Sequence, residues 1–475
     1  MSGSMSMGAD ALAMLPEVLL LLGAVGALVG GSFTPREKQW VVRLVAVAAL
    51  LGSGTAAAFG FAGEPTAVFS GTYTVDAVTG VVRLVVAAAV ILVIGLGVEE
   101  LTGHRQESET YALLLLSATG AVVVAGAGDL LVLAVGFFLA SIPLYGLVGQ
   151  ARTPAAAEAA MKTYLLGALL GIIMLVGIVV LLGVSGGTST YTQLTDALAA
   201  APAAAVVMGA TAVFVGLMFK AGGVPGHFWV PDAAQGAGLT AAAFLTTVPK
   251  VGALMAAYRL VDALPQEGDV QLLVAVLAAT SMTLGNLAAF AQDVPRRLLG
   301  WSTVSQVGYL LLPVAVAGRT DLALPALLVY LAAYAVTNLA AFAVVAALPD
   351  RRSLLDYRGL GRSHPALGAA LLVSLLGLVG TPPTAVFTGK LLVASAAWDG
   401  GYAWLAAVLA INTVASLFYY LRWIAPIYRG GEPQGTFDAP RPWAACAAVA
   451  AAAASIALGL AAGGVWSLVD GGISP

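Results

Sequence analysis

The sequence predicts an all-α polytopic membrane protein with about fourteen transmembrane helices, and three observations support this prediction. Of the 475 residues, 60% are apolar and only 9% are charged, and the mean hydropathy is +0.95. A soluble globular domain usually carries about 25% charged residues, so this chain could not cover itself with a polar surface. Its apolar stretches are continuous rather than alternating, which excludes a transmembrane β-barrel.

An apolar helix needs about 20 residues to cross a bilayer. Fourteen apolar segments of roughly that size follow one another along the chain. They cover residues 11–31, 40–61, 80–99, 109–126, 128–149, 160–184, 203–223, 238–261, 270–291, 298–317, 321–348, 366–396, 402–427 and 441–467. The first segment contains Glu17 and no basic residue precedes it, so we expect a retained helix rather than a signal peptide.

Basic residues predict the orientation of these segments. The loops after odd-numbered segments hold Arg36, Lys38, Arg105, Arg152, Arg296, Arg297, Arg351, Arg352, Arg358, Arg362, Arg429 and Arg441. The opposite side has only Arg259 and Arg319, with Arg83 just inside a segment. Because Lys and Arg favour cytoplasmic loops, we expect both termini to lie outside.

Two segments contain residues that break helices. The seventh reads MFKAGGVPGHFWVPD, with Gly222, Gly223 and Pro225, and the twelfth reads LVGTPPTAVFTGK, with Pro382 and Pro383. Paired interruptions at corresponding places indicate inverted repeats, here helices 4–8 and 9–13. We therefore expect one membrane domain over 1–475. Helices 1–3 would occupy 1–107, the repeats 108–262 and 268–430, and the last helix 431–475.

The lysines are distributed differently from the arginines. Only Lys38 lies in an obvious loop, whereas Lys162, Lys220, Lys250 and Lys390 lie in or beside apolar segments. A charge inside the bilayer costs about 2.5–3.5 kcal/mol on insertion scales. A desolvated lysine can lose its proton, which arginine cannot. The four lysines are therefore predicted proton-binding sites, and His227 could add another.

Structural alternatives exist for the same residues. Lys162 could snorkel to the interface or pair with Glu158 four residues earlier. His227 could hydrogen-bond a carbonyl that the break leaves free. Snorkelling explains Lys250 poorly, because apolar sequence extends on both sides. Four further residues are expected to have ordinary structural positions, as helix caps or at the membrane interface: Asp129, Asp232, Trp229 and Trp301.

Other chemistry is absent from the sequence patterns. The net charge of −3 is too small to suggest a nucleic acid partner. A single cysteine, Cys446, excludes an internal disulfide and any cysteine-built metal or iron–sulfur site, and its alanine-rich surroundings favour a small helical filler. We find no dinucleotide-binding fingerprint, phosphate-binding loop or cluster of metal ligands. No catalytic redox site or bound metal is expected in this chain.

Seven stretches of sequence, in order from helix 1 to helix 12, carry a resemblance to a known family. They are LPEVLL near Leu15, DLLVLAVGFFLAS from Asp129, EAAMKTYLLGA from Glu158, FKAGGVPGHFWVPDAAQGA, AAFLTTVPKVGAL, MTLGNLAAFAQDVPRRLLGWSTVSQVGY and GTPPTAVFTGK. Together they resemble the antiporter-like membrane subunits of respiratory complex I. The TVPK and PPTAVFTGK forms are more similar to subunit N than to subunits L and M or the sodium/proton antiporter homologues.

The resemblance implies one proton-translocating subunit of an NADH:quinone oxidoreductase in the bacterial cytoplasmic membrane. NADH, FMN, iron–sulfur clusters and quinone would be bound by partner subunits, and M-, K-, J-, L- and H-like membrane subunits would be neighbours. By position, Lys220 corresponds to the lysine of the broken seventh helix, Lys250 to the central lysine of the eighth, and Lys390 to that of the broken twelfth. Lys162 corresponds to a lysine of the sixth helix, and His227 to the histidine after the break.

The chain departs from the family pattern at one important position. Phe138, in VGFFLAS, occupies the place of a fifth-helix glutamate that pairs with the seventh-helix lysine in the family. Without that acid, Lys220 would be easier to neutralise and less coupled to its neighbours. Asp129 is no substitute, because nine residues place it about 13 Å away along a helix. Gln306 also stands where many relatives have histidine.

Two alternatives to a pumping subunit therefore stay open. The chain could belong to a cation/proton antiporter or a membrane-bound hydrogenase-type complex that shares the fold. It could also be a structural paralogue whose channel is impaired by Phe138.

Overall fold

The computed structural model describes residues 7–60, 65–265, 270–429, 438–461 and 463, and these residues are mostly helical. Thirteen helices within the described residues are long and apolar enough to cross a membrane. The twelfth predicted segment contains two shorter helices, α17 (Pro365–Val379) and α18 (Ala385–Asp399). The predicted all-α polytopic fold is confirmed.

The spans follow the predicted segments in order. They are α2 (Leu15–Phe33), α3 (Trp40–Gly60), α4 (Ala77–Leu96), α6 (Glu107–Gly126), α7 (Leu130–Gly149), α8 (Pro154–Val184), α10 (Ala203–Ala221), α12 (Leu239–Asp262), α13 (Val270–Phe290), α14 (Pro295–Ala315), α15 (Ala323–Ala347), α17 with α18, α19 (Ala403–Tyr428) and α20 (Pro442–Leu460). The short elements are α1 (Met7–Ala13), η1 (Arg36–Lys38), α5 (Val98–Leu101), α9 (Tyr191–Ala199), α11 (Trp229–Gly236), η2 (Leu354–Tyr357), α16 (Leu360–Ser363), and an antiparallel hairpin of β1 (Thr66–Val68) and β2 (Tyr73–Val75). The end of the last predicted segment, 464–467, lies outside the described residues.

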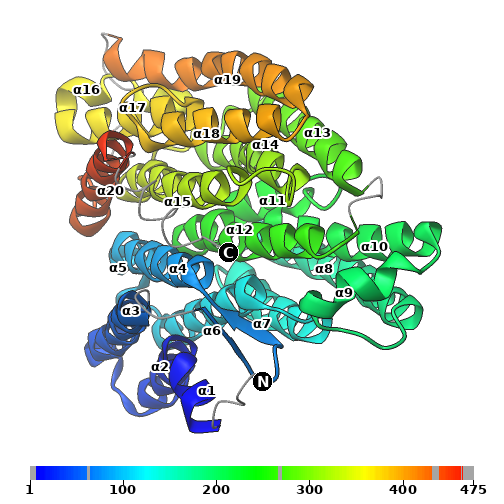
Figure 1. The fold of residues 1–475 in the computed structure, drawn as a ribbon. Coiled ribbons are helices and arrows are strands. Elements are labelled where there is room, and N and C mark those ends of the chain that lie inside the picture. Colours follow the sequence, from blue (N-terminus) through cyan, green and yellow to red (C-terminus); the bar gives the residue numbers. More distant parts are fainter. Residues whose placement is uncertain (1–6, 61–64, 266–269, 430–437, 462, 464–475) are drawn as a thin grey trace.

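The helix α12 lies at the centre of the molecule. In Figure 1 the N-terminal helices α1–α3 are at one end of the array, α16 and α19 are at the other, and α12 is between them. The apolar stretch of α12 is completely buried, whereas only 28% of the corresponding stretch of α3 or α20 is buried. A polar group on α12 must therefore find its partners inside the protein.

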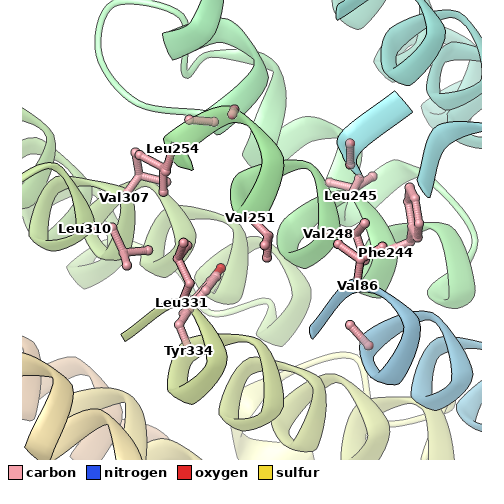
Figure 2. Packing of buried hydrophobic residues seen from close by; sticks show 14 of the residues in the cluster. Val86, Phe244, Leu245, Val248, Val251, Leu254, Val307, Leu310, Leu331 and Tyr334 are labelled. Atoms are coloured by element: carbon pink, nitrogen blue, oxygen red, sulfur yellow. The ribbon is translucent and has the colours of Figure 1, made fainter. Parts of the chain in front are cut away.

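Branched apolar side chains of α12 pack against three neighbouring helices. Figure 2 shows Leu245, Val248, Val251 and Leu254 of α12 beside Val86 of α4, Val307 and Leu310 of α14, and Leu331 and Tyr334 of α15. Because lipid tails are as apolar as these side chains, close van der Waals packing rather than escape from water holds such helices together.

Both predicted helix breaks are present, and each begins at a glycine. Gly222 ends α10 with φ of 80°, and Gly380 ends α17 with φ of 90°. These left-handed conformations suit glycine, which has no Cβ. Prolines follow in both cases, so the chain resumes a helix only at α11 and α18.

The one acid of the first span has a buried partner. Glu17 on α2 accepts hydrogen bonds from Arg83 on α4, at 2.7 Å from Nε and 2.8 Å from Nη2, and both side chains are almost fully buried. A bidentate pair of this kind compensates two charges that would otherwise be costly in the bilayer. This ion pair explains how Arg83 can be buried within a span.

Candidate functional site

Lys220 lies in the last turn of α10, just before the first break. Its side chain is buried, and its Nζ donates to the Ser141 hydroxyl on α7 at 3.2 Å. That hydroxyl donates in turn to the carbonyl of Phe137 at 2.7 Å, which leaves the lone pairs of its oxygen for the lysine. Ser141 was not identified from the sequence, because a serine in an apolar span carries no distinctive pattern.

Lys250 is held by a carbonyl that the preceding residue makes available. Pro249 has no amide hydrogen, so the carbonyl of Leu245, four residues earlier, loses its usual helical partner. The Nζ of Lys250 donates to that carbonyl at 2.7 Å, and the side chain has no exposed surface. The proline thus creates the acceptor that binds an amine in the middle of the bundle.

The aromatic residues after the first break correct one prediction. Trp229 does not belong to an interfacial belt: it is fully buried, and its ring centre lies 4.9 Å from Nζ of Lys250. The break turns α11 back into the core, where the indole donates to the carbonyl of Phe219 at 3.0 Å. His227 is also buried, and its ring centre lies 5.7 Å from that of Trp301, which is half-buried.

A set of polar groups lies between α12, α14 and α15, and its α12 members, Thr246 and Thr247, come about one helical turn before Lys250. The hydroxyl of Tyr334 donates to the carbonyl of Thr246 at 2.7 Å and lies 3.1 Å from the hydroxyl of Thr303. The amide of Asn338 donates to the hydroxyls of Thr246 and Thr247. These groups are all buried, so a polar layer crosses the centre of the molecule.

A second set of hydrogen bonds lies one turn further along α14. Gln306 accepts a hydrogen bond from the hydroxyl of Tyr330 at 2.6 Å and donates to the carbonyl of Leu378 at 2.8 Å. Leu378 lies directly before Val379, the last residue of α17. The polar layer therefore ends at the second helix break.

Lys390 lies at that second break. Its Nζ donates to the carbonyl of Val379 at 2.8 Å and to the hydroxyl of Thr413 at 3.3 Å, and it lies 4.0 Å from the ring centre of Tyr309. Val379 is four residues before Pro383, so its carbonyl also lacks the donor that a continuous helix would supply. Lys250 and Lys390 thus bind the same kind of oxygen.

Lys162 is not with the other three lysines. Its side chain is 46% exposed, and Nζ lies 2.6 Å from Glu158 and 2.8 Å from Asp232. Asp232 also binds Arg297 at 2.6 Å, so it joins α8, α11 and α14 by ion pairs. The i,i+4 alternative describes the position of Lys162. Asp129 caps α7, as expected, by accepting from two backbone amides.

Phe138 lies one turn before Ser141 on α7 and packs edge-on against Phe137, with ring centres 5.4 Å apart. In the described part of the chain, no carboxylate forms an ion pair with Lys220, Lys250 or Lys390. Neutral oxygens are their hydrogen-bond partners instead.

This arrangement suits groups that change their protonation state. A neutral amine keeps two N–H donors, so each lysine can bond its oxygen either with or without the extra proton. An ion pair would favour the charged form alone. Among the described residues, no group of three or more His, Cys, Asp or Glu side chains could hold a metal ion.

The chain is similar to known proteins over most of its length. The family described as "NADH:quinone oxidoreductase/Mrp antiporter, TM" matches residues 127–416. A protein named NADH-quinone oxidoreductase subunit N from Mycobacterium sp. (strain JLS) is 57% identical, over 96% of this chain and 98% of its own length. A Streptomyces griseus protein named NADH-quinone oxidoreductase subunit N 1 is 51% identical, over 97% and 98%.

Solved structures have the same fold. A chain of respiratory complex I from Thermus thermophilus with bound aureothin superposes with a TM-score of 0.84 at 31% identity, covering 96% of this chain and 99% of that chain. A chain of the Mrp complex from Dietzia sp. has a TM-score of 0.85 over 98% and 96% of the two chains. At 23% identity, that second likeness concerns the fold alone.

Proposed function

The chain belongs to the family of NADH-quinone oxidoreductase N subunits, and from that premise we propose that it moves protons through Lys220, Lys250 and Lys390. The observation that carries this proposal is the placement of three buried lysines on neutral oxygens. Each amine can gain or lose a proton without losing its hydrogen-bond partner. Their charges are therefore available to change during turnover.

The polar layer supports a route between the two breaks. Thr246, Tyr334 and Thr303 extend from the Lys250 region, and Gln306 with Tyr330 reaches the backbone beside Lys390. Hydroxyl groups both donate and accept, so together with water they can pass a proton along such a layer. His227, buried near the first break, would serve as an accessory site.

The protein is a membrane subunit and works as part of an oxidoreductase complex. We propose that NADH, FMN, iron–sulfur clusters and quinone are bound by partner subunits, and that its neighbours are M-, K-, J-, L- and H-like membrane subunits. The arginine-rich loops would face the cytoplasm of a bacterial cell, and both termini would lie outside. The two five-helix repeats would place the breaks of α10–α11 and α17–α18 at corresponding positions.

The alternative of an antiporter or hydrogenase-type subunit has weaker support. The Mrp chain is 23% identical and shares only the fold, whereas relatives at 57% and 51% identity are named N subunits. The alternative of an impaired channel depends on Phe138 and is tested directly by measuring pumping.

The test compares two substitutions of the central lysine in membrane vesicles that contain the whole complex. Lys250→Met removes the proton-binding group, and Lys250→Arg keeps a charge that cannot be released. Both should lower proton pumping per NADH oxidised by about tenfold or more, equivalent to at least about 1.4 kcal/mol in the barrier. The amount of assembled complex should change much less.

The matched control is Lys38→Met, in the short helix η1 at the surface, which should pump like the wild type. Normal pumping in both Lys250 variants would contradict the proposed role. Normal pumping in Lys250→Arg alone would show that a fixed positive charge, rather than proton exchange, is what the site needs.

A further inference from the structure

A cavity of about 610 Å³ opens at the end of α19, between this helix, η2 and the loop that precedes α14. It lies among the loops that follow odd-numbered spans, the same face that carries Arg296 and Arg297. Its lining includes apolar side chains, among them Phe418 and Leu421, and two arginines, Arg422 and Arg429. None of the residues that line the cavity contacts Lys220, Lys250 or Lys390 in the hydrogen bonds described above.

The apolar wall continues a stripe along the outside of α19. Ile411, Val414, Phe418 and Leu421 follow one another at spacings of three and four residues, and all are exposed. Such spacing places them on one face of a helix. Leu355 of η2, 60% exposed, faces the same cavity. The stripe therefore runs from the middle of the span to the mouth of the cavity.

The polar wall carries an unbalanced positive charge. Arg422 binds Asp293 at 2.6 Å and the carbonyl of Gln292 at 3.3 Å, so these two charges neutralise each other. Arg429, the C-cap of α19, is exposed and has no acidic partner among the described residues. Among the described residues that line the cavity, its guanidinium is the charge without a partner of opposite sign, at the end of the apolar stripe.

The dimensions place this charge at the membrane surface. The 26 residues of α19 span about 39 Å at 1.5 Å per residue, more than the hydrocarbon core of about 30 Å. Because Arg422 and Arg429 lie at the C-terminal end of α19, we place the excess length there, so that the last turns would extend into the headgroup region. A phosphate there would meet Arg429, with acyl chains along Phe418 and Leu421.

We propose that this cavity binds an anionic phospholipid of the bilayer, with its phosphate on Arg429 and an acyl chain against the α19 stripe. Basic pockets between spans on the cytoplasmic side are suited to anionic headgroups, and arginine binds phosphate oxygens in a bidentate manner. A second cavity, near α1 and α4, makes the contrast clear: it also contains an arginine, Arg83, but that charge is taken up by Glu17.

The test uses the whole complex in nanodiscs of phosphatidylcholine doped with phosphatidylglycerol that carries a photoactivatable group in one acyl chain. Labelled peptides are mapped after irradiation. Label should appear between Phe418 and Arg429, and Arg429→Gln should lower it about fivefold, the factor expected for one interfacial arginine. Arg429→Lys should keep most of it, which separates loss of charge from misfolding. Phe418→Ala should lower it without affecting assembly.

Arg362→Gln is the matched control, because this exposed arginine of α16 lies on the same face but outside the cavity. Its labelling should equal that of the wild type. Equal labelling by a phosphatidylcholine analogue would overturn the proposal, as would loss of label on adding inorganic phosphate, which would identify a free-anion site. The proposal would also be overturned if these residues carried no lipid label and were cross-linked to a neighbouring subunit instead.

Discussion

Lys250 and Lys390 each donate to a carbonyl four residues before a proline, but the two carbonyls belong to different parts of the structure. The carbonyl of Leu245 is on the same continuous helix as Lys250, whereas that of Val379 ends α17 and Lys390 lies on α18. The first acceptor is created by local sequence alone. The second depends on how two half-helices meet.

At each of the two breaks, a glycine lies close to one of these lysines. A Cβ added at Gly222 would lie 3.3 Å from Nζ of Lys250, and one added at Gly380 would lie 2.9 Å from Cδ of Lys390. Both breaks thus pack directly on a lysine, but only Lys390 joins the two halves of a broken span. If the proposed proton route holds, Lys250 would serve that route alone, whereas Lys390 would serve both the route and the assembly of its span.

The largest effect is therefore expected for Lys390→Met. The change leaves the Val379 carbonyl without a donor, which costs about 1–3 kcal/mol, and it removes the contacts to Thr413 on α19 and to the ring of Tyr309 on α14. Pumping should be lost, and the melting temperature of the complex should fall further than in Lys250→Met. Equal melting temperatures in the two variants would refute the bridging role of Lys390.

The origin of the Leu245 acceptor can be tested by Pro249→Ala. An alanine restores the amide hydrogen, which competes with Lys250 for the Leu245 carbonyl, and favours the helix by up to about 3 kcal/mol. Pumping should fall about fivefold, as expected for weakening one hydrogen bond by about 1 kcal/mol, while the complex stays at least as stable.

Pro143→Ala is the matched control for this change. Pro143 lies inside α7, and no lysine donates to Leu139, the residue four positions earlier, among the described contacts. This variant should pump normally. Equal losses in the two proline variants would mean that helix flexibility, and not the freed carbonyl, matters at Pro249.

The sequence predicted the spans well because the bilayer imposes their length. Thirteen of the fourteen apolar segments correspond to helices long and apolar enough to cross a membrane, and the twelfth contains the shorter helices α17 and α18. The breaks at Gly222 and Gly380 come where glycine and proline stand together. Ion pairs between different spans are harder to predict from the sequence. Glu17 and Arg83 are 66 residues apart, and nothing in either segment identifies the other.

Only some of the partners of the buried lysines can be predicted from the sequence. A proline directly before Lys250 already specifies which carbonyl is free, so the Leu245 acceptor was within reach of sequence reasoning. Trp229 was misassigned to the interface because composition does not reveal that α11 turns inward. Ser141 and Tyr309 reach their lysines from other helices, which only the packing determines.

A smaller effect is expected at the Lys220 site. Ser141→Ala removes the described hydrogen-bond partner of this lysine and should lower pumping about threefold, equivalent to about 0.7 kcal/mol. Adding Phe138→Glu to that variant should restore part of the loss, because position 138 lies about 4.5 Å away along the helix. Pumping is measured per NADH oxidised.

Ser117→Ala provides the control, since this buried hydroxyl binds the Ala140 carbonyl at 2.7 Å and contacts no lysine. It should leave pumping unchanged. If neither Ser141→Ala nor Phe138→Glu alters pumping, Lys220 lies outside the working route and the effect of Phe138 is structural only.

The smallest effect is expected for Lys162→Gln, although sequence position alone grouped this lysine with the others. Its charge is exposed and lies between two carboxylates, so it has no reason to release its proton. After the change, Asp232 keeps Arg297, and α11 stays attached to α14. Pumping and assembly should equal those of the wild type. A loss like that of Lys250→Met would show that burial on a neutral oxygen is not what distinguishes the working lysines, and that the ion pairs at Asp232 take part in pumping.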